Sequence, residues 1–145
     1  MRSVLASGLL LVLAATPVRG LNVSTHLYEP TDFARYLTFE LRDGTPAKDG
    51  EIGEEIRDLV ERHLLARGLT RDDAHPDAIV LIHAQQVGTS VLGMLYLDLL
   101  DGRSEKLVWR AEGSVTLALG KPRKIRRQIE QLIKEIFKRF PISGR

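Results

Sequence analysis

The side chains best suited to chemistry in this sequence are four histidines and two neighbouring aspartates. His26, His63, His75 and His83 each fall in a different predicted element, and none lies four residues from another. The chain has no cysteine, and zinc sites usually combine local pairs of His or Cys ligands. The sequence therefore predicts no metal site and no cofactor. His63 and His83 are interpreted as packing residues.

Asp98 and Asp101 lie three residues apart, and two carboxylates can share acid–base work. Asp101 precedes Gly102 between two strand-like segments, however, which is typical of an aspartate that builds a hairpin turn. No Gly-x-Ser-x-Gly, P-loop or Gly-x-Gly-x-x-Gly motif is present. We therefore assign no catalytic residue. The alternative is a small hydrolase assembled from scattered residues, with Asp98, Asp101 and His83 as candidates.

A basic segment near the C-terminal end is the most distinctive surface feature. Positions 121–139 hold eight basic and two acidic residues, a net charge of +6, whereas positions 21–120 carry −7. We predict a patch that binds an anion or a partner, formed by Arg123, Lys124, Arg126, Arg127, Lys134 and Lys138. The alternative is a solvated helix face whose charge is balanced by acids elsewhere in the fold.

The charge pattern also indicates the kind of partner. From position 21 onward the chain has 19 basic and 19 acidic residues, and no aromatic residues interleave with the basic run. Nucleic acid is therefore not expected as a partner. An envelope protein or an anionic envelope component fits better, and peripheral contact with lipid headgroups is one form of it.

The first 20 residues have the three parts of a secretory signal peptide. Arg2 is positive, residues 4–15 are apolar and uncharged, and small residues follow up to Gly20. The apolar stretch is too short to span a bilayer as a helix. We predict cleavage after Gly20 and a periplasmic location. Cleavage after Ala14 and an uncleaved N-terminal anchor are the alternatives.

The same segment excludes a lipid anchor on this chain. Leu13, Ala14 and Ala15 match the start of a bacterial lipobox, in which the next residue must be the cysteine that receives the lipid. Here that residue is Thr16. We predict a soluble protein that is not a lipoprotein.

Hydrophobic periodicity predicts a single α+β domain over residues 21–145. Helices are expected from Asp49, as N-cap, to Gly68 and from Pro122 to Phe140, because apolar residues recur there at helical spacing. Strands are expected over residues 21–27, 36–41, 78–84, 92–100 and 106–119, with turns at 88–90 and 101–104. Residues 70–77 are polar and predict a loop.

This order, β-β-α-β-β-β-α, predicts a two-layer sandwich in which two helices pack on a mostly antiparallel sheet of four to five strands. Residues 78–84 form a near-continuous apolar run. That run is typical of a central strand covered on both faces.

Several segments together resemble a bacterial family. They are Asp32-Phe33-Ala34-Arg35-Tyr36-Leu37-Thr38-Phe39, a helix ending at Gly68, Pro76-Asp77-Ala78-Ile79-Val80, Leu97-Asp98-Leu99-Leu100-Asp101-Gly102 running into Leu107-Val108-Trp109-Arg110-Ala111, and a last helix ending in Phe140-Pro141. In order and spacing they are similar to the small envelope proteins of domain-of-unknown-function family 4136 (DUF4136).

The resemblance implies an exported protein with an α+β fold. Family members are often lipid-anchored, and this chain departs from them at Thr16. The family has no established activity and offers no catalytic residues to carry over. We therefore expect a non-enzymatic binding or envelope-associated module.

Overall fold

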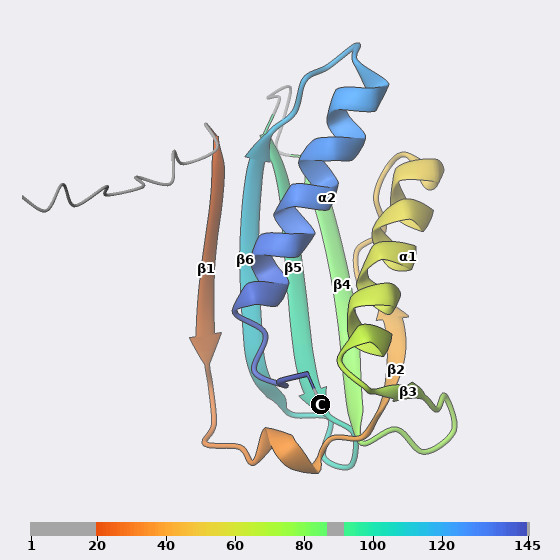
Figure 1. Ribbon diagram of the computed structural model, residues 1–145, viewed down its shortest axis with the longest axis vertical. Helices are drawn as coiled ribbons and strands as arrows, with labels where there is room; N and C mark the ends of the chain where they lie inside the picture. Colours follow the sequence, from red (N-terminus) through yellow and green to blue (C-terminus); the bar gives the residue numbers. More distant parts are fainter. Residues whose placement is uncertain (1–19, 87–91, 145) are drawn as a thin grey trace, which may run out of the picture.

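Six strands form one mixed sheet, and two helices pack on one of its faces (Figure 1). The computed structural model describes residues 20–86 and 92–144. In chain order the elements are β1 (Leu21–Leu27), the short 3-10 helix η1 (Phe33–Arg35), β2 (Thr38–Asp43), α1 (Gly50–Ala66), β3 (Thr70–Arg71), β4 (Ala78–Gln86), β5 (Leu92–Asp101), β6 (Leu107–Thr116) and α2 (Pro122–Lys138). Residues 1–19 of the predicted signal peptide and the predicted turn at 88–90 lie outside the described residues.

The strand order across the sheet is β1-β6-β5-β4-β2-β3. The α+β class is as predicted, but the sheet has six strands and mixed directions. β2 runs parallel to β4 and to β3, while β1, β6, β5 and β4 are antiparallel neighbours. The parallel pair arises because α1 carries the chain back before β4 begins beside β2. β3 has two residues, which is too short for a periodicity to reveal.

Helix α1 begins and ends as predicted. The side chain of Asp49 accepts hydrogen bonds from the backbone N–H groups of Glu51 at 2.9 Å and Ile52 at 3.2 Å. Gly68 follows the helix with a φ of 83°, a left-handed conformation that favours glycine. Ile56, Val60 and Leu64 form the buried stripe that faces the sheet.

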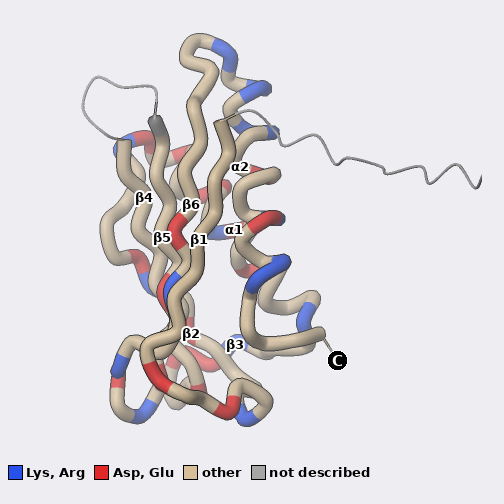
Figure 2. The backbone as a smooth tube through the Cα atoms, turned by 90° about the vertical axis from the view of Figure 1, so that its left-hand side faces the viewer, with Lys and Arg blue, Asp and Glu red and all other residues tan. Residues whose placement is uncertain are grey.

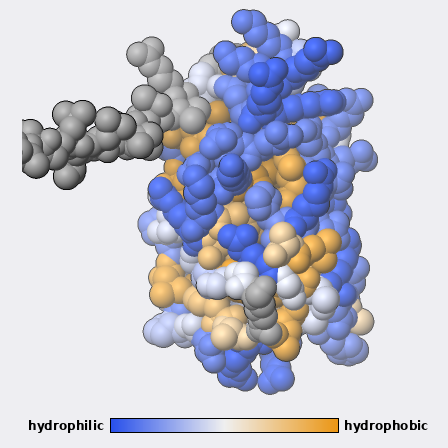
Figure 3. Space-filling view, viewed as in Figure 1, coloured by the Kyte–Doolittle hydropathy of each residue, from blue (hydrophilic) through white to orange (hydrophobic). Residues whose placement is uncertain are grey.

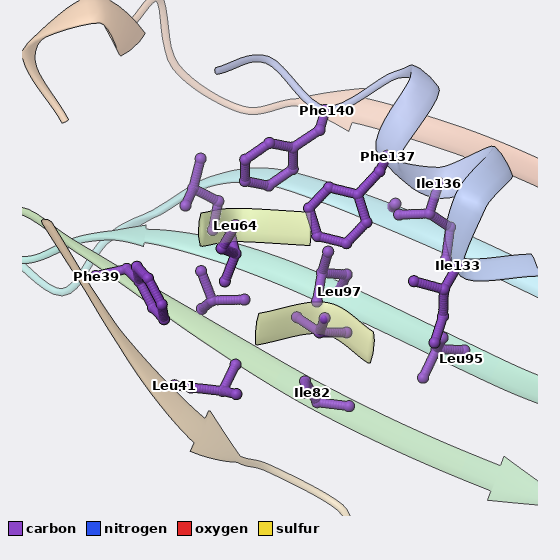
Figure 4. Packing of buried hydrophobic residues seen from close by; sticks show 14 of the residues in the cluster. Phe39, Leu41, Leu64, Ile82, Leu95, Leu97, Ile133, Ile136, Phe137 and Phe140 are labelled. Atoms are coloured by element: carbon purple, nitrogen blue, oxygen red, sulfur yellow. The ribbon is translucent and has the colours of Figure 1, made fainter. Parts of the chain in front are cut away.

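Helix α2 has the wider apolar stripe and contributes most to the core. Its buried residues are Ile129, Leu132, Ile133, Ile136 and Phe137. Figure 4 shows Ile133, Ile136 and Phe137 over the sheet, with Phe140 beyond the end of the helix and Phe39 across the core. No helix in the described part of the chain has the length and hydropathy needed to cross a bilayer.

The second face of the sheet carries no helix, as the side view in Figure 2 shows. Along β5, Leu95, Leu97 and Leu99 belong to the core, so Tyr96 and Asp98 lie on the open face. On β4 the prediction of cover on both faces is only partly right. Ile79 is 1% exposed, whereas Leu81 and His83 on the open face are half-buried.

Candidate functional site

Four basic side chains gather where α2 begins, and we call this group the basic tip: Lys121, Arg123, Lys124 and Arg127. All four are exposed and line a shallow hollow with Pro122. None of them forms a salt bridge with another described residue. Figure 2 shows basic positions at this end of α2, and Figure 3 shows a strongly hydrophilic surface there.

The six residues of the patch predicted from the sequence do not lie together in the structure. Arg123, Lys124 and Arg127 belong to the basic tip. Arg126 instead faces α1, with its guanidinium 3.4 Å from the carboxylate of Glu55 and 3.9 Å from that of Glu51.

The remaining two members of the predicted patch lie further along α2. Lys138 is 2.7 Å from the carboxylate of Glu135. Lys134 is exposed and lies about two helical turns beyond Arg127, the member of the tip nearest to it in sequence. The cations at one end of α2 thus have no salt bridge among the described residues, whereas Arg126 and Lys138 are paired with acids.

Helix stability does not explain the charges of the tip. The first turn of a helix is its positive end, where acidic side chains are favourable and basic ones are not. α2 has no acidic residue in its first turn, and its N-cap, Lys121, makes no side-chain capping hydrogen bond. α1 follows the usual pattern, with Asp49 as cap and Glu51 in its first turn. An external anion at the tip would complete α2 in the way that Asp49 completes α1.

The loop before α2 holds the tip in place. Gln128 donates to the carbonyl of Thr116 at 2.6 Å and accepts from the N–H of Ala118 at 3.0 Å. This ties the loop to the second turn of the helix. Leu119, between these anchors and the tip, is 53% exposed, an unusual placement for a large apolar side chain.

The basic tip shares one end of the molecule with the start of β1. Gly20 accepts a hydrogen bond from the N–H of Thr116 at 3.1 Å, and Thr116 ends β6, five residues before Lys121. Figure 1 shows the start of β1 and the start of α2 at the same end of the sheet. Gly20, the first described residue, therefore lies at the end of the molecule that carries the tip.

A small apolar cavity lies below this end, between the two helices and the sheet. Its volume is about 150 Å³. Ile52 and Ile56 of α1, Leu95 and Val115 of the sheet, and Ile129 and Leu132 of α2 are among its lining residues. None of the four residues of the basic tip lines it.

The candidates of the hydrolase alternative are only partly brought together. His83 lies beside Asp98 on the open face, with Nε2 3.4 Å from a carboxylate oxygen. The N–H of Thr45 donates to His83 Nδ1 at 3.1 Å, so that this nitrogen is an acceptor and the neutral ring carries its proton on Nε2. Asp98 is 3% exposed and is held by Arg110 through both oxygens, at 2.6 and 2.7 Å.

Asp101 does not join them. Its carboxylate accepts from the N–H groups of Arg103 and Ser104 and from the Ser104 hydroxyl, all within its own turn. Its other oxygen accepts from the hydroxyl of Tyr36 at 3.0 Å. These hydrogen bonds, led by the one from Ser104 N–H, lower the pKa of Asp101. The turn assignment is confirmed.

The other three histidines lie in separate places. His63 stacks on Phe137 with ring centroids 4.6 Å apart. His26 is exposed on β1, and His75 is exposed in the loop between β3 and β4. Burial and the nearby charge of Arg67 lower the pKa of His63.

Sequence reasoning missed two residues at this end of the molecule and one ion pair. Lys121 and Leu119 were not assigned to the patch, although Lys121 is the first residue of the basic run.

The pairing of Asp98 with Arg110 follows from the hairpin register, in which these two residues are opposite. Counting outward from the Asp101–Gly102 turn would have placed Asp98 opposite Trp109, because the ladder shifts register between Leu99 and Leu100.

Comparison with known proteins gives a family and a fold. The sequence profile described as "Domain of unknown function (DUF4136)" matches residues 23–142. No functionally curated protein matches the chain.

Two solved structures illustrate the likeness of fold. A PelC dodecamer from Paraburkholderia phytofirmans aligns with a TM-score of 0.55 and 13% identity, over 86% of this chain and 99% of that one. A PDZ domain protein from Parabacteroides distasonis aligns with a TM-score of 0.62 and 15% identity, over 87% of this chain and 38% of that one.

Proposed function

The chain belongs to the DUF4136 family, whose profile covers residues 23–142, and from this premise we propose that it is an exported, non-enzymatic module of the bacterial envelope. In this proposal the basic tip binds the anionic headgroups of a phospholipid membrane. The protein works in the periplasm, as its predicted signal peptide indicates.

The observation that carries the proposal is the unpaired state of the basic tip. Arg123, Lys124 and Arg127 are exposed and without a salt bridge to any described residue, while Arg126 in the same run is neutralised by Glu55 and Glu51. Their place at the positive end of α2 gives the fold no benefit. Phosphate groups of lipids would gain both from the cations and from the helix N-terminus.

Two features favour a membrane over a protein partner of acidic character. Leu119 is exposed beside the cations, and interfacial binding sites combine an apolar side chain with a basic surface. Gly20 lies at the same end of the molecule. In this proposal, that end stays next to the membrane until the predicted signal peptide is removed.

Vesicle binding tests the proposal. The purified protein is mixed with phosphatidylcholine vesicles, with or without phosphatidylglycerol, and the bound fraction is measured by flotation. We expect binding only to the anionic vesicles, weakening as salt is added. Each cation near such a surface contributes about 1 kcal/mol. The triple variant Arg123→Glu, Lys124→Glu and Arg127→Glu is therefore expected to bind at least about tenfold more weakly.

The matched control reverses three other exposed cations that form no salt bridge with described residues: Arg62, Arg103 and Lys106. It changes the net charge by the same amount and should retain binding. Equal loss in both triple variants would show a net-charge effect and overturn the proposal. Equal binding to neutral vesicles would do so as well. A second variant, Leu119→Ser, should weaken binding without changing its salt dependence.

A further inference from the structure

We propose that the protein forms a symmetric dimer in which β1 pairs antiparallel with β1 of a second copy. β1 is the last strand on its side of the sheet, and no other described element lies beyond it in Figure 1. An unpaired strand edge presents N–H and C=O groups that another strand can satisfy. This inference is independent of the proposed membrane binding.

The hydrogen bonds to β6 fix which backbone groups of β1 face outward. The N–H of Tyr28 donates to Val108, and Gly20 accepts from Thr116. In an antiparallel ladder the residues bonded to the partner alternate along the strand. The even-numbered residues of β1 therefore bond to β6. The backbone groups of Leu21, Val23, Thr25 and Leu27 point away from the sheet.

This edge has little of the protection that natural edge strands carry. β1 has the sequence Leu-Asn-Val-Ser-Thr-His-Leu, with no proline and no Asp, Glu, Lys or Arg. The opposite edge, β3, has two residues, one of which is Arg71. On β1, the Arg139 guanidinium donates to the carbonyl of Val23. An incoming strand would take over this one hydrogen bond.

The sequence of β1 is nearly the same in both directions, which favours a second copy over an unrelated strand. With a twofold axis at Ser24, Leu21 lies opposite Leu27, Asn22 opposite His26, and Val23 opposite Thr25. The first pair is apolar, the second can hydrogen-bond, and the third joins two β-branched residues of similar shape. No charge meets a like charge. Such an interface is isologous, with each strand supplying the same patch.

The dimer would also cover apolar surface that the monomer exposes. Leu27 is 59% exposed, and in this register it lies beside Leu21 of the partner. The two sheets would continue into one, with both pairs of helices on the same face. Because the strands are antiparallel, the two basic tips would point to opposite ends of the dimer.

Charge placed at the twofold axis tests the register directly. Ser24 is exposed, and in the dimer it meets itself in a close, non-hydrogen-bonded pair. The self-association of the wild type is measured by sedimentation equilibrium, where we expect a concentration-dependent dimer. Ser24→Asp alone and Ser24→Lys alone should each weaken it about tenfold or more, because like charges are then opposite. An equimolar mixture of the two variants should restore a heterodimer.

Two further variants separate pairing from folding. Thr25→Pro removes an N–H that points outward, so it should abolish the dimer and leave the thermal midpoint nearly unchanged. Ser24→Pro removes an N–H that bonds to β6 and should destabilise the fold itself. Arg139→Ala frees the Val23 carbonyl and should strengthen the dimer. The matched control is Ser143→Asp with Ser143→Lys, exposed and distant in sequence from β1.

Several results would overturn the proposal. They are a wild type that stays monomeric at all concentrations, Ser24 variants that associate like the wild type, and a mixture of Asp and Lys variants that does not recover. A weaker dimer in Arg139→Ala would place Arg139 inside the interface and would also contradict it.

Discussion

Arg110 holds both carboxylate oxygens of Asp98, at 2.6 and 2.7 Å, on the face of the sheet that no helix covers. Asp98 is 3% exposed. Hydrogen bonding to Asp98 raises the pKa of Arg110 above its usual range. The guanidinium also lies 5.6 Å from the centroid of the Tyr96 ring. A paired, nearly buried carboxylate thus lies in the middle of the face that no helix covers.

Removing one partner of this pair should be costly, because the other charge is left nearly buried. We expect Arg110→Ala to lower the free energy of unfolding by about 3 kcal/mol. The double variant Asp98→Leu with Arg110→Leu, which removes both charges, should remain within about 1 kcal/mol of the wild type. Urea unfolding of the three proteins gives both values. A loss below about 1 kcal/mol in Arg110→Ala would contradict this account.

Two glycine substitutions should differ sharply. A Cβ at Gly102 would lie 2.0 Å from the carbonyl oxygen of Pro76, a backbone atom that cannot move aside cheaply. Gly102→Ala is therefore expected to lower the stability by about 3 kcal/mol. Gly50, the first residue of α1, has no atom within 4 Å of such a Cβ. Gly50→Ala should be neutral or stabilising by at most about 1 kcal/mol. Thermal unfolding of both variants measures the two changes in stability. Equal losses of stability would contradict the predicted clash at Gly102.

Stability should fall in mild acid because of His63. Its burial, with the charges of Arg67, Arg62 and Lys134, lowers its pKa below 6.5. As the pH falls through 6.5, the unfolded chain binds a proton that the folded chain does not, so folding becomes less favourable. His63→Phe keeps the stacking on Phe137 and cannot be protonated. Urea unfolding between pH 7.5 and 5 should show a smaller loss in this variant than in the wild type. Parallel pH profiles would refute the assignment.

Tyr36 should titrate above the usual range of a tyrosine. Burial and the hydrogen bond to Asp101 raise its pKa to about 12. Above pH 10 the unfolded tyrosine loses its proton while the folded one keeps it, so stability falls as the pH rises. Ultraviolet absorbance titration should show a tyrosine that ionises near pH 12. Asp101→Asn should lower the pKa of this group, and Tyr36→Phe should remove its late absorbance change.

If both proposals hold, the dimer should join vesicles. Its two basic tips point in opposite directions, so one dimer can contact two anionic surfaces. We expect the wild type to increase the turbidity of phosphatidylglycerol vesicles. Ser24→Asp should bind the same vesicles without joining them. If this monomeric variant also aggregates the vesicles, the link between vesicles does not depend on the dimer.

Much of the local structure could be predicted from the sequence. The cap at Asp49, the glycine at position 68, the turn at Asp101–Gly102 and the apolar stripe of α2 are all confirmed. Each depends on residues within a few positions of one another, because caps, turns and helical periodicity are local properties. The family resemblance is confirmed too, since it rests on the order of such segments.

The arrangement in space was decided only by the tertiary structure. The sequence did not show that β2 lies parallel to β4, that Arg126 turns towards Glu55, or that Gly20 and Lys121 share one end of the molecule. These relationships join residues far apart in the chain. They follow from how two helices and six strands bury their apolar sides together, which no local pattern encodes. The sequence by itself thus determined the basic run, and only the fold separated its paired from its unpaired charges.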